Sequence, residues 1–234
     1  MPRSLTQAAI DDFRERLRRI AVEMFAEVGQ DGFNMRELGK RVGVSAMTPY
    51  RYFSDKDEIL ASIRTQAFAR LADRLDGALE LGSSTAEKVA AIGNAYVEFA
   101  GQEPLYYRLM FDFSRPKRNS YPEQEFQENR VRSAFTSLIR GLMAQHELDG
   151  EPERIAQVLW TAIHGAIALD LAGQPMSGPL ELINEMVRLV VSGYRASPAL
   201  GRDQAKKRRR DFTLPPTRRQ QSVQSDCAHV VTAE

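Results

Sequence analysis

The sequence NMRELGKRVGVSAMTPYRYF occupies residues 34–53, near the start of the chain. Asn34 with Glu37 three residues later is a capping-box pattern for the start of a short helix, and Gly43 is suited to end that helix. Ser45 is suited to cap a second short helix, because its hydroxyl can accept a hydrogen bond from an amide of the first turn. Two short helices joined by a tight turn, with basic and aromatic side chains outside, are typical of a helix-turn-helix that reads double-stranded DNA.

Helical periodicity continues on both sides of this stretch. Apolar residues from Phe13 to Val28 recur at three- and four-residue intervals, which predicts a first helix that stops at Gly29. After the stretch, Ser54 is suited to cap a long helix, which is the fourth from the N-terminus. The second helix of the motif is predicted over 46–53, and the long helix over 55–81. The same pattern predicts further helices over 84–101, 122–145, 152–172 and 179–196. Between them lie a short apolar segment over 104–111 and a polar loop over 112–125.

These elements define the expected fold class, because no strand pattern stands out. We expect an all-α protein in which an N-terminal three-helix DNA-binding domain is joined by the long fourth helix to a second helical domain. The chain has 234 residues, 43% of them hydrophobic, which is enough to bury a sizeable core. Its apolar runs are far shorter than the ~20 residues that span a bilayer, so we expect a cytoplasmic protein without a membrane partner.

Composition also bears on cofactors. Cys227 is the single cysteine, and the histidines at 146, 164 and 229 are too scattered to indicate a zinc site. No glycine-rich phosphate loop or activated nucleophile is evident, so we expect neither a cofactor nor an enzyme. Residues 71–197 carry 12 Lys or Arg against 17 Asp or Glu, whereas both ends of the chain are basic. From Ser197 the pattern predicts a disordered tail, and its Lys206–Arg210 run of five cations is able to add sequence-independent affinity for DNA.

The motifs resemble a known family. The segments GQDGF, MRELGKRVGVS, TPYRYF and SDKDEIL are similar to the DNA-binding domain of the TetR family of bacterial transcriptional regulators, over residues 10–70 with the helix-turn-helix at 34–53. Residues 71–196 resemble in layout that family's helical effector-binding and dimerisation domain, and 197–234 form the tail. PLYYRLMF and WTAIHG (160–165) resemble the subgroup whose C-terminal domain is named for a Trp-His-Gly motif.

The second helix of such a motif lies in the major groove with its first residues against base edges. Arg51 is suited to a bidentate hydrogen bond with guanine, and the Thr48 methyl or Met47 to contact with a thymine methyl. The resemblance implies phosphate contacts by Tyr52 and Lys56. Pro49 departs from the apolar residue, often leucine, that the family has there, which leaves open how Met47 and Thr48 face. The predicted DNA-binding residues are Arg36, Ser45, Ala46, Met47, Thr48, Tyr50, Arg51, Tyr52 and Lys56.

The resemblance implies a ligand-responsive repressor, a homodimer on a palindromic operator that a small apolar effector releases. A transcriptional activator of the same fold and a helical adaptor protein that does not bind DNA are alternatives. Large apolar residues of the middle helices are candidates for the effector pocket, although ordinary core packing of Trp160 and His164 gives the same pattern. The candidate pocket residues are Tyr96, Phe99, Tyr107, Met110, Phe111, Trp160, Ile163 and His164, and the candidate dimer-interface residues are Leu182, Ile183, Met186, Val187 and Val190.

Overall fold

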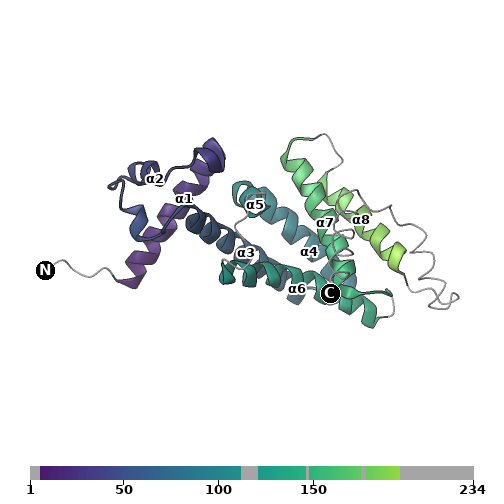
Figure 1. Ribbon diagram of the computed structural model, residues 1–234. Helices are drawn as coiled ribbons and strands as arrows, with labels where there is room; N and C mark the ends of the chain where they lie inside the picture. Colours follow the sequence, from purple (N-terminus) through teal and green to yellow (C-terminus); the bar gives the residue numbers. More distant parts are fainter. Residues whose placement is uncertain (1–5, 112–120, 146–147, 175–177, 196–234) are drawn as a thin grey trace, which may run out of the picture. The chain divides into compact units, whose positions relative to one another are not determined.

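The computed structural model describes residues 6–111, 121–145, 148–174 and 178–195, and the expectation of an all-α fold is confirmed (Figure 1). Within these ranges extended residues pair only at an isolated bridge between Leu148 and Arg195. None of the described helices is long and apolar enough to cross a membrane. The elements are α1 (Gln7–Gly32), α2 (Met35–Val42), a 3₁₀ turn η1 (Pro49–Arg51), α3 (Lys56–Leu81), α4 (Thr85–Gln102), α5 (Pro104–Phe111), α6 (Pro122–Ala144), α7 (Pro152–Leu171) and α8 (Pro179–Tyr194).

The first helix and the start of the motif form as the caps predict. Gly29 takes φ 68° and ψ −178°, so α1 is broken there, and only a short turn continues to Gly32. Asn34 Oδ1 accepts a 2.8 Å hydrogen bond from the Arg36 amide at the start of α2. Gly43 ends α2 in the left-handed region, at φ 81°, where a side chain would be strained.

The predicted α-helix over 46–53 is wrong. The structure has a turn at residues 46–48 and then the short 3₁₀ turn η1. Proline has no amide hydrogen, so Pro49 cannot donate to the Ser45 carbonyl as an α-helix requires. The Thr48 amide bonds that carbonyl instead, at 2.9 Å, and this three-residue spacing is the 3₁₀ pattern.

The expectation that Ser54 caps the long helix is also wrong. Asp55 is the N-cap of α3, and its side chain accepts a 2.8 Å hydrogen bond from the Glu58 amide. Ser54 donates instead to the Glu58 carboxylate, through its amide at 2.6 Å and its hydroxyl at 2.7 Å. The aspartate wins because its ionised oxygen is the stronger acceptor at the positive end of the helix.

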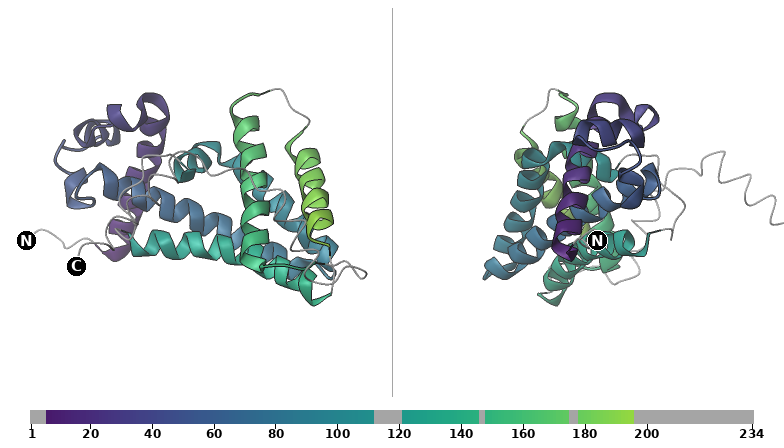
Figure 2. Two further views of the ribbon diagram at one scale, coloured as in Figure 1. Left: turned by 45° about the vertical axis from the view of Figure 1, so that its right-hand side comes forward. Right: turned by 90° about the vertical axis from the view of Figure 1, so that its left-hand side faces the viewer.

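Two clusters of buried apolar side chains meet along α3. The first, which we call the head core, joins α1, α2, Phe53 after η1 and the start of α3 with one residue of α5. It contains Leu17, Ala21, Val22, Met24, Phe25, Phe33, Met35, Leu38, Val42, Phe53, Ile59, Leu60, Ile63 and Leu109. The second, the body core, surrounds Phe68, Leu71 and Leu75 of α3 and includes buried residues from each of α4 to α8. Figure 2 shows α6 lying along α3, and α7 beside α8.

The remaining helices begin close to their predicted residues. Ser84 and Glu87 form a complete capping box at the start of α4. Pro122, Pro152 and Pro179 each open a helix, where the missing amide costs no hydrogen bond. The predicted loop 112–125 is too long at its end, since α6 already starts at Pro122, and residues 112–120 lie outside the described ranges. The predicted tail, with Lys206–Arg210, lies outside them as well.

Candidate nucleic-acid interface and ligand cavity

The predicted DNA-binding residues lie on the outer surface of the helix-turn-helix. Arg36, Ser45, Arg51 and Lys56 are exposed, Met47 is 61% exposed and Tyr50 39% exposed. Ala46, Thr48 and Tyr52 are half-buried, whereas Pro49 is buried against the head core side of the motif. Seven of the nine residues lie within 45–52. Arg36 lies at the start of α2, and Lys56 lies at the start of α3.

The turn before η1 fixes how Met47 and Thr48 face. The hydroxyls of Ser45 and Thr48 share a 2.9 Å hydrogen bond, which turns the Thr48 hydroxyl back along the chain. Met47 has no such tie and extends outward, as its exposure shows. The orientation that the sequence left open is thus decided by local hydrogen bonding.

The two expected phosphate-binding residues are held differently. The Tyr52 ring packs against Phe13 of α1, with 4.7 Å between the ring centroids, so only part of the side chain is exposed. Lys56 is the first residue of α3, and its Nζ donates to the Gln30 carbonyl at 3.3 Å. The amides of a helix start and its dipole favour an anion, so an ammonium group there is suited to a phosphate oxygen.

The eight candidate pocket residues do not share one cavity. Tyr96, Phe99 and Met110 are fully buried in the body core. Ile163 lines a small cavity of about 190 Å³ between α4, α6, α7 and α8. Trp160 lines a cavity of about 390 Å³ between α6 and α7, which we call the outer cavity; its other lining residues are Arg132, Phe135, Thr136, Glu153, Ala156 and Gln157.

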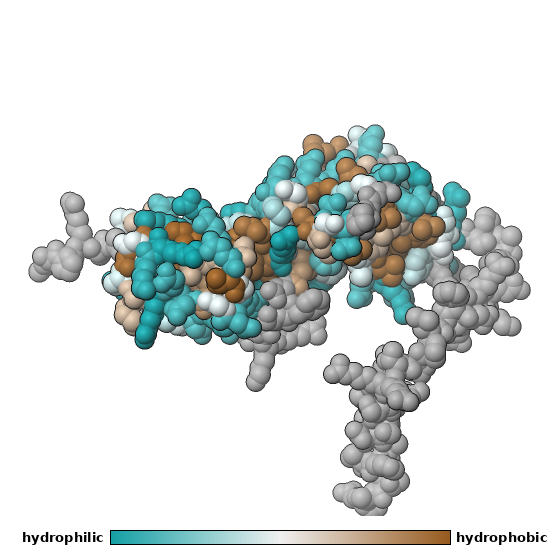
Figure 3. Space-filling model, turned by 90° about the horizontal axis from the view of Figure 1, so that it is seen from above, coloured by the Kyte–Doolittle hydropathy of each residue, from teal (hydrophilic) through white to brown (hydrophobic). Residues whose placement is uncertain are grey.

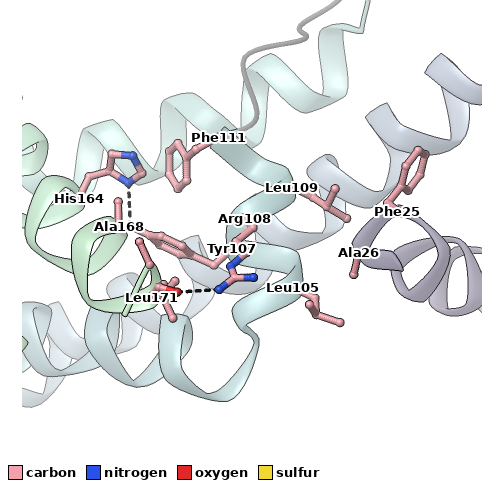
Figure 4. A pocket seen from close by; sticks show the side chains of 11 residues that line it. Phe25, Ala26, Leu105, Tyr107, Arg108, Leu109, Phe111, His164, Ala168 and Leu171 are labelled. Atoms are coloured by element: carbon pink, nitrogen blue, oxygen red, sulfur yellow. Dashed lines mark hydrogen bonds between the residues drawn. The ribbon is translucent and has the colours of Figure 1, made fainter. Parts of the chain in front are cut away.

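Tyr107, Phe111 and His164 meet in a larger space of about 530 Å³, which we call the junction cavity (Figure 4). Three helices supply its walls: α1 with Phe25 and Ala26, α5, and the C-terminal half of α7. The sequence reasoning missed the residues of α1, because Phe25 reads as a core residue and is in fact only 4% exposed. The remaining lining residues are Leu105, Arg108, Leu109, Ala168, Leu171 and Ala172.

Two polar contacts tie α5 to α7 at the junction cavity, and Figure 4 draws both. The Tyr107 hydroxyl lies 2.7 Å from His164 Nδ1, and Arg108 Nη2 donates to the Leu171 carbonyl at 2.6 Å. Burial lowers the pKa of His164 and raises the pKa of Tyr107. Neutral His164 is therefore able to accept a hydrogen bond from the Tyr107 hydroxyl at Nδ1.

The polar contacts continue from the junction cavity to the outer cavity. The side chains of Tyr107 and Tyr96 interact, and Trp160 Nε1 donates to the Tyr96 hydroxyl at 2.9 Å. Burial raises the pKa of Tyr96 to about 12, so it stays protonated at neutral pH. The half-buried Trp160 and His164 are thus linked through the buried Tyr96 and Tyr107 in one row of polar groups.

Helix α5 connects the head to the body. Leu109 belongs to the head core, while Tyr107 and Met110 belong to the body core. The fully buried Arg64 of α3 donates through Nε to the Leu109 carbonyl at 2.8 Å, which holds α5 against α3. A change in the position of α5 is therefore felt by both cores.

One candidate for the dimer interface faces inward. Ile183 is 2% exposed in the body core, and a Cβ added to Gly93 of α4 would lie 3.7 Å from it. Ile183 therefore lies on the face of α8 that packs on α4 within the protomer. Leu182, Met186, Val187 and Val190 are half-buried along α8, and Leu180 and Leu189 are exposed. Figure 3 shows apolar residues reaching the surface in the part of the molecule that carries α7 and α8.

Comparison with protein families gives two matches. Residues 17–63 match the model described as bacterial regulatory proteins, tetR family, and residues 89–193 match the one described as tetracyclin repressor-like, C-terminal domain. The first covers the helix-turn-helix, and the second covers α4 to α8 apart from their outermost residues. The assignment to a Trp-His-Gly subgroup stays a prediction.

Individual relatives agree with these matches. An HTH-type transcriptional regulator of Mycobacterium tuberculosis is 23% identical, over 77% of this chain and 93% of the relative. A structure of a Rhodococcus protein of unknown function has a TM-score of 0.68 at 23% identity, covering 84% of this chain and 100% of that one. FadR of Thermus thermophilus, a repressor solved in complex with lauroyl-CoA, has a TM-score of 0.57 at 22% identity, covering 80% and 99%.

Proposed function

Since this chain belongs to the TetR family of bacterial regulatory proteins, we propose that it is a repressor that binds a palindromic operator as a homodimer and leaves it when a small effector binds. Its DNA-binding helix-turn-helix makes it a transcriptional regulator, and the repressor role, the operator and the effector are the parts proposed here. Its working place is the cytoplasm, where bacterial DNA is found.

The exposed surface of the motif is the observation that carries the proposal. Arg51 and Met47 stand out from η1 and the turn before it, in position to reach base edges. Lys56, at the start of α3, and Tyr52, anchored on Phe13, are in position to bind phosphates on either side. Arg36, Ser45, Ala46, Thr48 and Tyr50 complete the proposed contact surface.

The homodimer is supported by the apolar residues that α7 and α8 leave exposed. Val158 and Leu169 of α7 are 43% and 48% exposed, and Leu180 and Leu189 of α8 are 41% and 64% exposed. Pairing of these two helices with a second copy would form a four-helix interface with two-fold symmetry. The recognition segments of the two copies, residues 45–52, would then enter successive major grooves about 34–36 Å apart. The operator sequence must therefore be a rough palindrome.

The junction cavity is the proposed effector site. It replaces the eight candidate pocket residues predicted from the sequence, which do not share one cavity. It is mainly apolar and is bounded by the DNA-binding head as well as the body. The repressor of Thermus thermophilus that resembles this chain was solved with lauroyl-CoA, which supports a ligand with an apolar chain. The effector must bind more tightly to the geometry that fits DNA badly, because only differential affinity shifts an equilibrium.

Selection of fragments from the source genome that bind the purified protein tests the proposal. We expect enrichment of a short palindromic duplex. The double variant Tyr52→Phe, Lys56→Gln should lose that affinity while its oligomeric state in sedimentation is unchanged. An adaptor protein would enrich no duplex, and an activator would bind the same palindrome but raise transcription of the neighbouring gene in a reporter strain.

A further inference from the structure

The charge of the junction cavity is one-sided. Of its eleven lining residues, Arg108 alone carries a permanent charge, His164 is held neutral by burial, and no acidic residue contributes. The rest of the lining is apolar apart from the Tyr107 hydroxyl. Among the described residues of this lining, a ligand with an apolar body therefore meets one cation and no anion.

Arg108 is the outermost polar group of the cavity. Its side chain is exposed, and within the described part of the chain its guanidinium donates to one neutral acceptor, the Leu171 carbonyl at the end of α7. A guanidinium has five N–H donors in a planar fork that matches a carboxylate or a phosphate. Charge-assisted, bidentate hydrogen bonds are shorter and stronger than a bond to a neutral carbonyl, so an anion that engages Nη2 would displace the Leu171 carbonyl from it.

We propose that the junction cavity binds an amphipathic anion, with its apolar body between α1, α5 and α7 and its charged group on Arg108 in place of the Leu171 carbonyl. The proposal rests on the proposed function only in taking this cavity as the effector site. Its apolar part would lie against Phe25 of the head and Ala168 of the body, which bound the space on opposite sides (Figure 4).

The exchange of partner on Arg108 explains how binding of such a ligand changes the packing of the DNA-binding head. Loss of the Arg108–Leu171 hydrogen bond removes one of the two polar contacts that hold α5 to α7. Helix α5 places Leu109 in the head core, and Phe25 stacks on Phe33 with 4.1 Å between ring centroids, directly before α2. A ligand that moves α5 or Phe25 therefore acts on the packing that sets the helix-turn-helix.

Arg108 has a competing structural role, because a cation near the last carbonyls of a helix stabilises that end. In that case its replacement would lower thermal stability slightly and leave ligand preference unchanged. The two roles differ in what they predict for ligands of equal length and different charge, and that difference is the basis of the experiment.

The experiment uses the full chain without DNA. Binding of decanoate, decyl phosphate, decanol and decyltrimethylammonium is measured by titration calorimetry below their micelle concentrations. We expect the two anions to bind at least about tenfold more tightly than decanol, since hydrogen bonds to charged groups are worth that factor or more, and the cation to bind most weakly. Tighter binding of decanoate than of decyl phosphate would indicate a carboxylate ligand, and the reverse order would indicate a phosphate ester.

Two variants locate the anion. Arg108→Gln should abolish the preference for decanoate over decanol without changing decanol binding, while Arg108→Lys should retain part of it. Arg132→Gln is the matched control, because Arg132 lies over the Trp160 ring at 6.0 Å in the outer cavity and should leave the preference intact. The proposal is overturned if decanol binds as tightly as decanoate, or if only Arg132→Gln removes the preference.

Operator release is then measured separately. If decanoate binds through Arg108 but does not release DNA, the ligand class stands and the effector role in the proposed function fails. If DNA binds the wild-type protein while no decyl compound does, the ligand class fails and the DNA-binding role stands.

Discussion

The Tyr107 hydroxyl lies 2.7 Å from Nδ1 of His164, which joins α5 to α7 beside the junction cavity. The Phe111 ring lies against the same imidazole, with 4.1 Å between centroids. A neutral imidazole can accept the hydroxyl proton at Nδ1, whereas an imidazolium has no acceptor there. Protonation would leave Nδ1 able only to donate, and it would place a charge among aromatic rings.

This contact predicts a loss of stability in mild acid. Burial lowers the pKa of folded His164 below its ordinary 6.5, so the unfolded chain binds the proton more readily. The stabilisation from neutral His164 is complete above pH 6.5 and is lost as the pH falls from there toward the folded pKa. Urea unfolding at pH 7.5 and pH 5.5 should show a larger decrease for the wild type than for His164→Gln. Equal decreases in the two proteins would assign the acid sensitivity to other groups.

The proposed phosphate contact by Lys56 predicts a change in salt dependence. Each phosphate contact contributes about 0.9 to the slope of log affinity against log salt concentration. Because the proposed homodimer carries two copies of Lys56, Lys56→Gln should lower that slope by about 1.8 in fluorescence anisotropy with the selected operator, and should weaken all duplexes to a similar extent. Lys88→Gln on α4, outside the proposed contact surface, is the control and should leave the slope unchanged. An unchanged slope in Lys56→Gln would remove Lys56 from the interface.

Ala26 offers a way to fill the junction cavity from the DNA-binding side. It is an exposed residue of α1 that lines the cavity, so Ala26→Trp adds an indole there without removing a core side chain. If occupancy of the cavity opposes DNA binding, this variant should bind the operator on the order of 5- to 150-fold more weakly, the usual range of an allosteric coupling. It should also lose decanoate binding.

The same substitution elsewhere on α1 controls for the added ring. Ala8 is exposed in the first turn of α1 and does not line the junction cavity, so Ala8→Trp should leave both affinities unchanged. Normal operator affinity in Ala26→Trp, together with lost decanoate binding, would show that the cavity binds ligands without controlling DNA.

The head could be predicted from sequence because its signals are local. Asn34 and Gly43 act through residues within one helical turn, and the apolar spacing from Phe13 to Val28 predicts the helix that supplies Leu17 and Phe25 to the head core. The wrong prediction of an α-helix over 46–53 also has a local cause, which is the missing amide of Pro49. Pro49 is atypical for such a helix, yet the pattern alone does not show that the missing amide leaves a 3₁₀ turn in place of an α-helix.

The junction cavity could not be predicted, because it depends on three distant segments. Phe25, Arg108 and Leu171 meet only after α1, α5 and α7 have packed, and the composition of each helix resembles ordinary core. Ile183 shows the same limit on α8. Its apolar neighbours Leu182 and Met186 are half-buried, and only packing on α4 determines which of them faces inward.

Gly39 is the point where α2 touches the turn of the motif. A Cβ added there would lie 2.8 Å from the Ser45 carbonyl oxygen, 3.1 Å from Ala46 Cα and 3.2 Å from Pro49 Cδ. Two of these atoms belong to the backbone, which cannot rotate away as a flexible side chain would. Gly39 is therefore required by the close approach of η1 and its preceding turn to α2, although its position inside a helix is otherwise unfavourable.

Gly39→Ala should consequently lower the free energy of unfolding by about 1–3 kcal/mol, the usual cost of overpacking. It should also weaken operator binding, because the turn that carries Met47 must move outward. Gly77→Ala is the matched control: Gly77 lies within α3, a Cβ there meets nothing within 4 Å, and the higher helix propensity of alanine should raise stability by up to about 1 kcal/mol. Thermal unfolding and anisotropy of both variants test this. If Gly39→Ala is as stable as the wild type and binds DNA as tightly, the turn does not hold the recognition segment in the position that the structure gives it.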